Sequence, residues 1–326
     1  MNRFKLTGKS LLTLNEFSTE ELDFILTQAS ELKEKKRNRV FDENLKHRNI
    51  CGIFLKPSAR TSTSFVVACA DEAASLEFFP AENIRFGYKE SVKDIAKLLG
   101  RNFDGIAFRG FDHTVAEDLA RYSGIPVWNG LTDDHHPTQL LADVLTMQEE
   151  FGELAGLQVA YVGDGRNNVA TSLAIGALKL GYHLRIVSPE SLLPSATLVA
   201  QIKADTPESW GSISFTSSIE DGVKDAAVIY TDVWVSMGEE DKIEQRINSL
   251  KAYKITQQVL DMTGRKDTIF LHCLPAFHDL ETEVARNFPD IREVDDEVFT
   301  GPQSRVFEQA ENRMHTIKSL MIATIN

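Results

Sequence analysis

The sequence predicts an α/β protein of two domains, each an open parallel sheet flanked by helices, with interdomain helices joining them. Three observations lead to this prediction. The 326 residues exceed what one hydrophobic core usually organises. Short apolar runs alternate with amphipathic helical patterns along the whole chain. Long helical patterns lie near the middle and at the end of the chain, where they can connect the two domains.

The first half begins with an amphipathic helix over residues 18–36, capped by Ser18 or Thr19. Strands are expected at residues 50–55, 75–79, 105–109 and 126–128. Helices are expected after the first strand, near residues 92–99 and 115–122, and from Pro137 onward.

A second series of strands follows the helix over residues 137–151. These strands are expected at residues 158–162, 184–187, 213–215, 228–231 and 269–271, with a helix near 170–180. The closing helix over 304–325 is long enough to return to the first half. We therefore expect a first domain of residues 1–148, completed by 304–326, and a second domain of residues 149–303.

Composition and charge limit the function. The chain is 42% hydrophobic and 25% charged, as in ordinary globular proteins, and its formal charge of -13 lacks the basic field that nucleic acid or an anionic membrane requires. Three cysteines without CxxC spacing suggest neither disulfides nor a zinc site. The sequence has no apolar leader and no apolar stretch of about 18 residues. We expect a cytoplasmic protein with neither a nucleic-acid nor a membrane partner.

Polar side chains follow the strands of the first half at their carboxyl ends, where open parallel sheets bind ligands. Residues 56–64 form a hydroxyl-rich turn with Arg60 that opens into a helix, which suits an anion but equally fits helix capping. Arg109 ends the third strand, and His136 and Gln139 follow the fourth. An imidazole at a helix start can polarise a carbonyl group, and a Gln amide can recognise a planar NH2 group.

The strands of the second half also end in polar residues. They lead into residues 163–168, into the loop 232–238 that starts with Asp232, and into residues 272–275 with Cys273. Taken singly, Asp232 fits a turn cap and Cys273 a buried inert thiol. The glycines of residues 163–165 also allow a dinucleotide-binding oxidoreductase, although the third glycine of GxGxxG is missing at its spacing.

At these residues the sequence resembles the ornithine carbamoyltransferases, and the resemblance covers nearly the whole chain. Six blocks occur in the family order: Gly87-x-x-Glu90-Ser91-x-Lys93-Asp94, Leu99-Gly100-Arg101, His136-Pro137-Thr138-Gln139-x-x-Ala142-Asp143, Asp232-Val233-Trp234-x-Ser236-Met237-Gly238, His272-Cys273-Leu274-Pro275 and Glu311-Asn312-Arg313-Met314-His315-Thr316. The fourth and fifth blocks resemble the ornithine enzymes rather than relatives that act on aspartate, putrescine or acetylornithine. The resemblance implies carbamoyl transfer from carbamoyl phosphate to L-ornithine, without a metal or a cofactor.

The resemblance also implies roles for individual residues, with the first domain binding carbamoyl phosphate and the second ornithine. The residues implied for carbamoyl phosphate are Ser58, Ala59, Arg60, Thr61, Arg85, Arg109, His136, Gln139, Cys273, Leu274 and Arg313. Those implied for ornithine are Asn168, Asp232, Ser236 and Met237. The catalytic set is Arg109, His136, Asp232, Cys273 and Arg313.

One block departs from the family pattern. Residues 58–62 read Ser-Ala-Arg-Thr-Ser where the family usually has Ser-Thr-Arg-Thr-Arg. Together with Arg85, where ornithine enzymes commonly carry Gln, this resembles the phaseolotoxin-insensitive branch. In the family, subunits form homotrimers and a loop from the neighbour, here carrying Arg85, completes each site. A carbamoyltransferase acting on another amine and a non-catalytic paralogue remain as alternatives.

Overall fold

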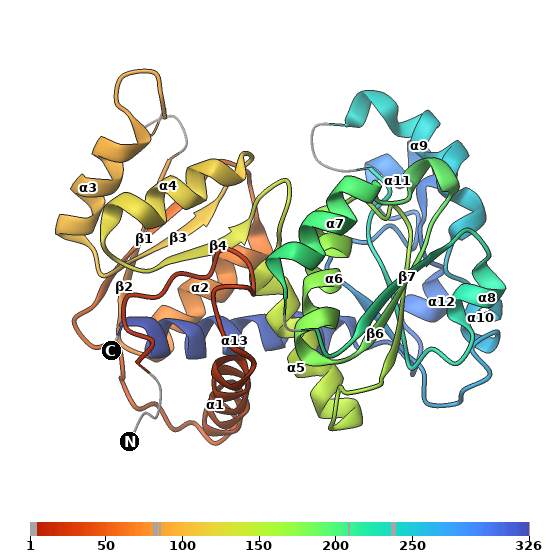
Figure 1. The fold of residues 1–326 in the computed structure, drawn as a ribbon, viewed down its shortest axis with the longest axis horizontal. Coiled ribbons are helices and arrows are strands. Elements are labelled where there is room, and N and C mark those ends of the chain that lie inside the picture. Colours follow the sequence, from red (N-terminus) through yellow and green to blue (C-terminus); the bar gives the residue numbers. More distant parts are fainter. Residues whose placement is uncertain (1–4, 81–83, 85, 208, 236–238, 326) are drawn as a thin grey trace. The chain divides into compact units, whose positions relative to one another are not determined.

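The computed structural model describes residues 5–80, 84, 86–207, 209–235 and 239–325. The chain forms two compact units, one of Met1–Leu145 with Glu311–Asn326 and one of Thr146–Ala310. Both boundaries fall inside helices, α5 (Pro137–Phe151) and α13 (Val306–Ile325), so each of these helices continues from one unit into the other (Figure 1).

The first unit contains a four-stranded parallel sheet in the order β2-β1-β3-β4. Its elements, besides the parts of α5 and α13, are α1 (Thr19–Arg37), β1 (Asn49–Phe54), α2 (Ala59–Asp71), β2 (Ser75–Phe79), α3 (Val92–Asn102), β3 (Gly105–Arg109), α4 (His113–Ser123) and β4 (Val127–Leu131). Helices α3 and α4 lie on one face of the sheet, and α2 and α13 lie on the other (Figure 1).

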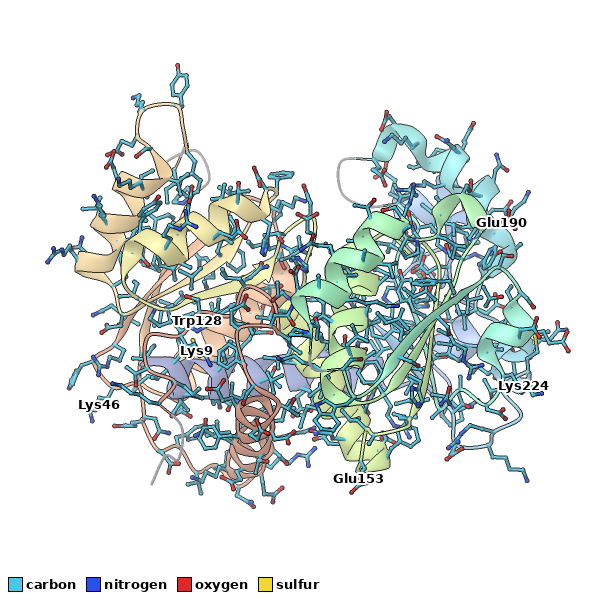
Figure 2. All side chains as sticks on the ribbon, viewed as in Figure 1. Lys9, Lys46, Trp128, Glu153, Glu190 and Lys224 are labelled. Carbon is cyan, nitrogen blue, oxygen red and sulfur yellow. The ribbon has the colours of Figure 1, made fainter. Side chains whose placement is uncertain are left out.

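Apolar side chains alternate between the two faces of this sheet, as a strand periodicity of two requires. Ile53, Ile106 and Phe108 belong to a core cluster that includes side chains of α3 and α4. Trp128, labelled in Figure 2, is fully buried, and its Nε1 donates to Oγ1 of Thr324 on α13 at 3.0 Å. Each large apolar side chain buried in this way contributes about 1.5–3 kcal/mol, so both helical layers are held firmly to the sheet.

Helix α1 begins where the sequence predicts. The Ser18 side chain accepts from the amide of Glu21, and the Glu21 side chain accepts from the amide of Ser18, which together form a capping box. Basic residues occupy the last turn, where they interact favourably with the helix dipole. The predicted helix and its Ser18 cap are confirmed.

The second unit contains a five-stranded parallel sheet in the order β7-β6-β5-β8-β9. Its strands and α-helices are β5 (Gln158–Val162), α6 (Asn168–Leu180), β6 (His183–Val187), α7 (Ala196–Asp205), β7 (Ser212–Thr216), α8 (Ile219–Val223), β8 (Val228–Thr231), α9 (Ile243–Leu250), α10 (Gln257–Asp261), β9 (Ile269–His272), α11 (Glu283–Asn287) and α12 (Asp296–Phe299). Its 3-10 helices are η1 (Glu190–Leu192), η2 (Glu240–Lys242), η3 (Lys251–Tyr253) and η4 (Pro289–Ile291).

Helices also cover both faces of the second sheet. Apolar side chains of α8, α10 and α12 form one core cluster with Ala160, Ile229 and Phe270 of the strands, while α6 and α7 lie on the opposite side of the sheet (Figure 1). Side chains of β5 and β8, two adjacent interior strands, are almost entirely buried. The strand ends of this sheet are therefore fixed by the core beneath them.

The predicted fold class, two open parallel sheets flanked by helices, is confirmed. Strand β4 extends to Leu131 instead of ending at Trp128, because its ladder with β3 continues past Asn129 through an irregularity at Phe108 and Arg109. Helices α7 to α12 were not predicted. Most of them are too short, at 4 to 10 residues, to show a helical period in the sequence.

No helix in the described ranges combines the length and the apolar character that a bilayer crossing requires.

Gly100 of α3 provides a test of the packing between α3 and α4. A Cβ atom at this position would lie 1.8 Å from the backbone oxygen of Ser123 at the end of α4. We expect Gly100→Ala to lower the free energy of unfolding by about 1–3 kcal/mol, because backbone has to move to relieve the clash. Urea unfolding measures this change. Lys97→Ala, on the exposed side of α3, is the control, and equal unfolding midpoints for the two variants would refute the packing account.

Candidate active site

Each sheet reverses its winding direction at one place, and the polar residues gather there. In the first sheet the chain winds from β1 to β2 on one side and then continues with β3 and β4 on the other. In the second sheet the same reversal occurs between β5 and β8. At such a switch point the loops after the two central strands diverge and leave a crevice at the carboxyl ends of the strands. The residues after β1, β3, β5 and β8 are therefore the ones placed to bind ligands.

The loop after β1 leads directly into α2. Ser58 is the N-cap of this helix, and its hydroxyl accepts from the Thr61 amide at 3.1 Å. Thr61 is 1% exposed, and among the described residues no partner lies within hydrogen-bonding distance of its hydroxyl. The first amides of a helix, a buried hydroxyl and the Arg60 side chain together form a surrounding that suits an anion.

Ser62 offers no donor to an anion, because its amide and its hydroxyl are both bound within the helix. That amide donates to the Ser58 carbonyl oxygen at 3.3 Å, and the Ser62 hydroxyl donates to the carbonyl oxygens of Ser58 and Ala59. Both donors are consumed inside the first turn of α2. Position 62 thus supplies nothing in place of the family's arginine.

Basic side chains from three separate segments surround the buried His136, which directly precedes α5. Burial lowers the pKa of His136 well below its usual value, and the charges of Arg313, Arg109 and Arg60 lower it further. The imidazole is therefore neutral near pH 7. Arg60 follows β1, Arg109 ends β3 and Arg313 lies on α13, so the fold of the first unit brings together residues that are up to 253 positions apart, from 60 to 313. The sequence analysis singled out all four.

Gln139 and Arg313 form a buried polar chain beside His136. Nη1 of Arg313 donates to Oε1 of Gln139 at 2.7 Å, and Nε2 of Gln139 donates to Oδ1 of Asp143 at 2.7 Å. All three side chains are at least 98% buried. Asp143 thus fixes which way the Gln139 amide points, and Gln139 in turn orients the guanidinium group.

Lys56 is a further basic residue of this loop that was not assigned a role from the sequence. Its Nζ donates to Oδ1 of Asp133 at 2.6 Å and lies 4.1 Å from the ring centroid of Phe111. The lysine is 6% exposed. It therefore ties the start of the loop after β1 to the segments after β3 and β4. The burial of Lys56 was hard to predict from the sequence, because a lysine in a loop is usually solvated.

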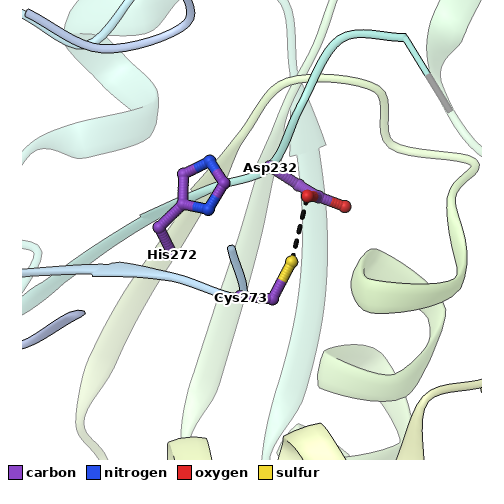
Figure 3. Close-up of side chains that lie close together, drawn as sticks. All are labelled: Asp232, His272 and Cys273. Atoms are coloured by element: carbon purple, nitrogen blue, oxygen red, sulfur yellow. Dashed lines mark hydrogen bonds between the residues drawn. The ribbon is translucent and has the colours of Figure 1, made fainter. Parts of the chain in front are cut away.

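In the second unit, Asp232 and Cys273 lie together at the ends of β8 and β9 (Figure 3). The Cys273 thiol donates to Oδ1 of Asp232 at 3.0 Å. Nδ2 of Asn167 donates to Oδ2 of the same carboxylate at 3.1 Å and to the hydroxyl of Tyr161 at 2.7 Å. Burial raises the pKa of Tyr161 well above its usual value, and the Asp232 charge adds to this. Asp232 and Cys273 therefore present a carboxylate and a thiol in fixed positions at this edge of the sheet.

Asn167 also belongs to this cluster, because its side chain contacts Asp232. Asn167 caps α6 by accepting from the Ala170 amide, while Asn168 is the first residue of that helix. The sequence analysis assigned Asn168 to ornithine, which stays a prediction, and assigned no role to Asn167. Asn167 directly precedes a helix, and in the sequence this position indicates only a helix cap.

Asp164, in the same loop after β5, is held by two arginines. Arg166 binds both of its carboxylate oxygens at 3.0 Å, and Nη1 of Arg246 on α9 donates to Oδ2 at 2.5 Å. Burial raises the pKa of Asp164, but the Arg166 hydrogen bonds and the Arg246 charge outweigh it and bring the pKa below its usual value. This ion-pair network fixes the loop that carries Asn167.

The donor atoms of Asp232, His272 and Cys273 lie within 4.8 Å of one another, a separation that a metal ion can bridge. The imidazole has no lone pair to offer such an ion in this arrangement. Nδ1 of His272 accepts from the Leu274 amide at 2.9 Å, and Nε2 pairs with Glu293 at 3.1 Å. These residues do not fit a three-ligand metal centre.

The remaining predicted site residues fall into two groups. Ala59 starts α2, and Leu274 follows Cys273 with φ of 60°, in the left-handed region. Arg85, Ser236 and Met237 lie outside the described residues. The structure thus brings Arg60, Arg109, His136, Gln139 and Arg313 together in the first unit, and Asp232 with Cys273 in the second.

Two family models cover most of the chain. The aspartate/ornithine carbamoyltransferase carbamoyl-P binding domain matches residues 9–149, and the aspartate/ornithine carbamoyltransferase Asp/Orn binding domain matches residues 155–324. The chain is 62% identical over 320 residues to ornithine carbamoyltransferase 2, phaseolotoxin-insensitive, from Pseudomonas syringae pv. actinidiae, covering 98% of both chains. It is 49% identical to the catabolic ornithine carbamoyltransferase of Bacillus licheniformis, covering 98% of this chain and 97% of the relative.

Solved structures agree with these relatives. The fold matches an ornithine carbamoyltransferase from Pyrococcus furiosus with a TM-score of 0.89 at 36% identity, covering 99% of this chain and 98% of that one. It matches the ornithine carbamoyltransferase from Thermus thermophilus with a TM-score of 0.82 at 35% identity, covering 98% and 99%. The chain therefore belongs to the aspartate/ornithine carbamoyltransferase family, and within it to the ornithine carbamoyltransferases.

Proposed function

We propose that the two residue clusters at the switch points hold the two substrates of one reaction, the transfer of a carbamoyl group from carbamoyl phosphate to the side-chain amine of L-ornithine. The observation that carries this proposal is the contrast between them. Three arginines surround a neutral imidazole in the first unit, whereas a carboxylate and a thiol are paired in the second. The first cluster suits an acyl phosphate and the second suits a diamine.

Carbamoyl phosphate is assigned to the first domain, proposed as residues 1–148 completed by 304–326. The α2 amides at Ala59 and Arg60, the Arg60 guanidinium and the Thr61 hydroxyl hold the phosphate, with Ser58 shaping the turn. Arg109, His136 and Arg313 donate to the carbonyl oxygen. This oxygen gains negative charge as the tetrahedral species forms, and each preorganised donor lowers the barrier by about 3 kcal/mol.

The NH2 group of carbamoyl phosphate is assigned to two acceptors, Oε1 of Gln139 and the carbonyl oxygen of Leu274. Oε1 already accepts from Arg313, and a carbonyl oxygen has a second lone pair for the substrate. Accepting a hydrogen bond from the NH2 group fixes the plane of the carbamoyl group, which orients its carbon for attack.

Ornithine is assigned to the second domain, proposed as residues 149–303. Asn168, Ser236 and Met237 hold its α-amino and carboxylate ends, and Asp232 with Cys273 receives the δ-amine. An alkyl amine has a pKa of about 10.4 in water and has to lose a proton before it can attack. Its nitrogen then bonds to the carbonyl carbon, and the bond from that carbon to the phosphate oxygen breaks. Citrulline and phosphate are the products.

The assembly is proposed to be a homotrimer in which Arg85 of a neighbouring subunit supplies the positive charge that Ser62 lacks. We also assign the enzyme to the cytoplasm, where its three cysteines, free and buried, stay reduced. Ornithine carbamoyltransferases named anabolic and catabolic both match the chain, and the 62% identity to the anabolic one favours the direction that makes citrulline.

The first prediction concerns the acceptor. We expect citrulline formation from ornithine and carbamoyl phosphate, and little product with putrescine or acetylornithine. Asp232→Asn removes the charge opposite the δ-amine and should lower kcat/KM for ornithine by about 10²- to 10³-fold. Asp290→Asn, at an exposed position, is the control. A wild-type enzyme that makes no citrulline, or that prefers another amine, rules out the proposed acceptor.

The second prediction concerns pH. In the folded state the pKa of His136 lies below its unfolded value of about 6.5. Below pH 6.5 the unfolded chain therefore binds more protons than the folded chain. The free energy of unfolding falls as the pH is lowered. Wild type should lose more unfolding free energy between pH 7.5 and 5 than His136→Gln, by at most about 2 kcal/mol. Urea midpoints at the two pH values measure this difference, with His183→Gln as control. Equal losses in wild type and His136→Gln contradict a neutral, buried imidazole.

The third prediction concerns toxin insensitivity, which we attribute to the altered loop after β1. Ala59→Thr combined with Ser62→Arg restores two donors, and each charge-assisted hydrogen bond contributes about 1.5–3 kcal/mol. The double variant should bind phaseolotoxin at least about tenfold more tightly than wild type, as measured by inhibition of citrulline formation. Thr63→Arg is the control, because it adds the same charge at the next residue of α2, which is exposed. Unchanged inhibition of the double variant would remove this explanation.

A further inference from the structure

The turn after β9 carries two groups assigned to the reaction, the Cys273 thiol and the Leu274 carbonyl oxygen. Leu274 has φ of 60°, which is unfavourable for a residue with a branched side chain and persists only where neighbouring contacts enforce it. Two side chains that are completely buried, those of His272 and Glu293, contact backbone amides of this turn.

Hydrogen bonds determine the protonation of His272. The Leu274 amide donates to Nδ1 at 2.9 Å, so Nδ1 must present a lone pair. An imidazole with a lone pair on Nδ1 carries its proton on Nε2, and Nε2 lies 3.1 Å from Oε1 of Glu293. The ring is therefore neutral, and Nε2 donates to the glutamate. One tautomer satisfies both contacts.

Glu293 spans the rest of the turn. Its Oε1 also accepts from the Phe277 amide at 2.7 Å, so one oxygen atom connects His272 to the far end of the segment. The backbone of Glu293 is itself anchored, because its carbonyl oxygen accepts from the Ile255 amide at 2.8 Å. The amide of His272 donates to Oε1 of Gln309 at 3.0 Å. Both members of the pair are thus fixed to the body of the second unit.

Stability alone does not explain a buried polar pair of this kind, because well-packed apolar side chains of similar volume often stabilise a protein as well or better. Burial raises the pKa of Glu293, and the His272 hydrogen bond opposes that rise. The pair instead fixes the orientation of the turn, because it holds the amides of Leu274 and Phe277 in place. Cys273 lies between the anchored amides of His272 and Leu274, and the Leu274 carbonyl lies between the anchored amides of Leu274 and Phe277.

We propose that His272 and Glu293 are positioning residues for carbamoyl transfer, which aim the Cys273 thiol and the Leu274 carbonyl oxygen through the amides of Leu274 and Phe277. This inference rests on the proposed function of the site. His272 contacts neither substrate in this assignment and acts through the next two residues. Glu293 acts through His272 and Phe277.

Two substitutions of His272 separate its two contacts. In His272→Asn the amide oxygen lies where Nδ1 was and can still accept from the Leu274 amide. In His272→Gln the amide nitrogen lies where Nε2 was and can still donate to Glu293, but the acceptor for Leu274 is lost. We expect kcat to fall at least about 100-fold in His272→Gln, because a reacting group displaced by about 1 Å costs that much. In His272→Asn kcat should stay within about tenfold of wild type.

Alkylation of Cys273 by iodoacetamide gives a readout that does not depend on activity. Burial raises the pKa of Cys51 and of Cys69 to about 12, so these two thiols react slowly in the folded protein. Cys273 should react severalfold faster in His272→Gln than in His272→Asn, because its turn is no longer held. Exposed Glu297→Gln is the control for both readouts. Thermal melts show that each variant is folded at the assay temperature.

Equal kcat values and equal alkylation rates in the two His272 variants overturn the proposal, and so does the reverse order. If neither variant folds, Glu293→Gln and Glu293→Leu decide in the same assays. The glutamine keeps an acceptor for Nε2 of His272 and for Phe277, whereas leucine keeps neither, so equal values again overturn the proposal. A wild-type enzyme that makes no citrulline refutes the proposed function, while the alkylation rates still decide the positioning.

Discussion

The winding of the two parallel sheets is the constraint on which the rest of the structure depends. A parallel strand needs a crossover helix, and reversing the direction of winding separates two adjacent loops at the carboxyl edge. In the first unit that reversal lies between β1 and β3, and in the second between β5 and β8. The buried strands fix the carboxyl edges of both sheets. Polar side chains just beyond these edges are therefore held in place by the strands, and the loops that carry them do not have to be rigid.

The two units also differ in the charge of their polar clusters, which is basic in the first unit and acidic in the second. The whole chain carries a formal charge of -13, yet Arg60, Arg109 and Arg313 converge on His136. Burial and these charges keep the imidazole neutral, so it adds no further cation to the three arginines. In the second unit the thiol and amide partners of Asp232 satisfy its carboxylate oxygens. Gln139 orients Arg313, and Asn167 and Cys273 hold Asp232, so charged groups of both clusters are preorganised, which is how a site favours a transition state.

The sequence predicts the fold and the first-unit cluster well, because apolar alternation locates the strands and parallel topology decides which residues follow their ends. It predicts the second unit less completely. The contact of Asn167 with Asp232 spans 65 positions, and the pair His272 and Glu293 spans 21. Such partners depend on strand register and on loops with no helical or strand period. Lys56 was overlooked for another reason, since nothing local distinguishes a buried lysine from a solvated one.

The most direct test is a crystal structure of the enzyme with carbamoyl phosphate bound. We expect the phosphate at the start of α2, within hydrogen-bonding distance of the Arg60 guanidinium and the Thr61 hydroxyl. The carbonyl oxygen should face Arg109 and His136, at the reversal between β1 and β3. Carbamoyl phosphate bound at another edge of the first sheet, or held without Arg60 and His136, would contradict the claim that the switch point forms the site.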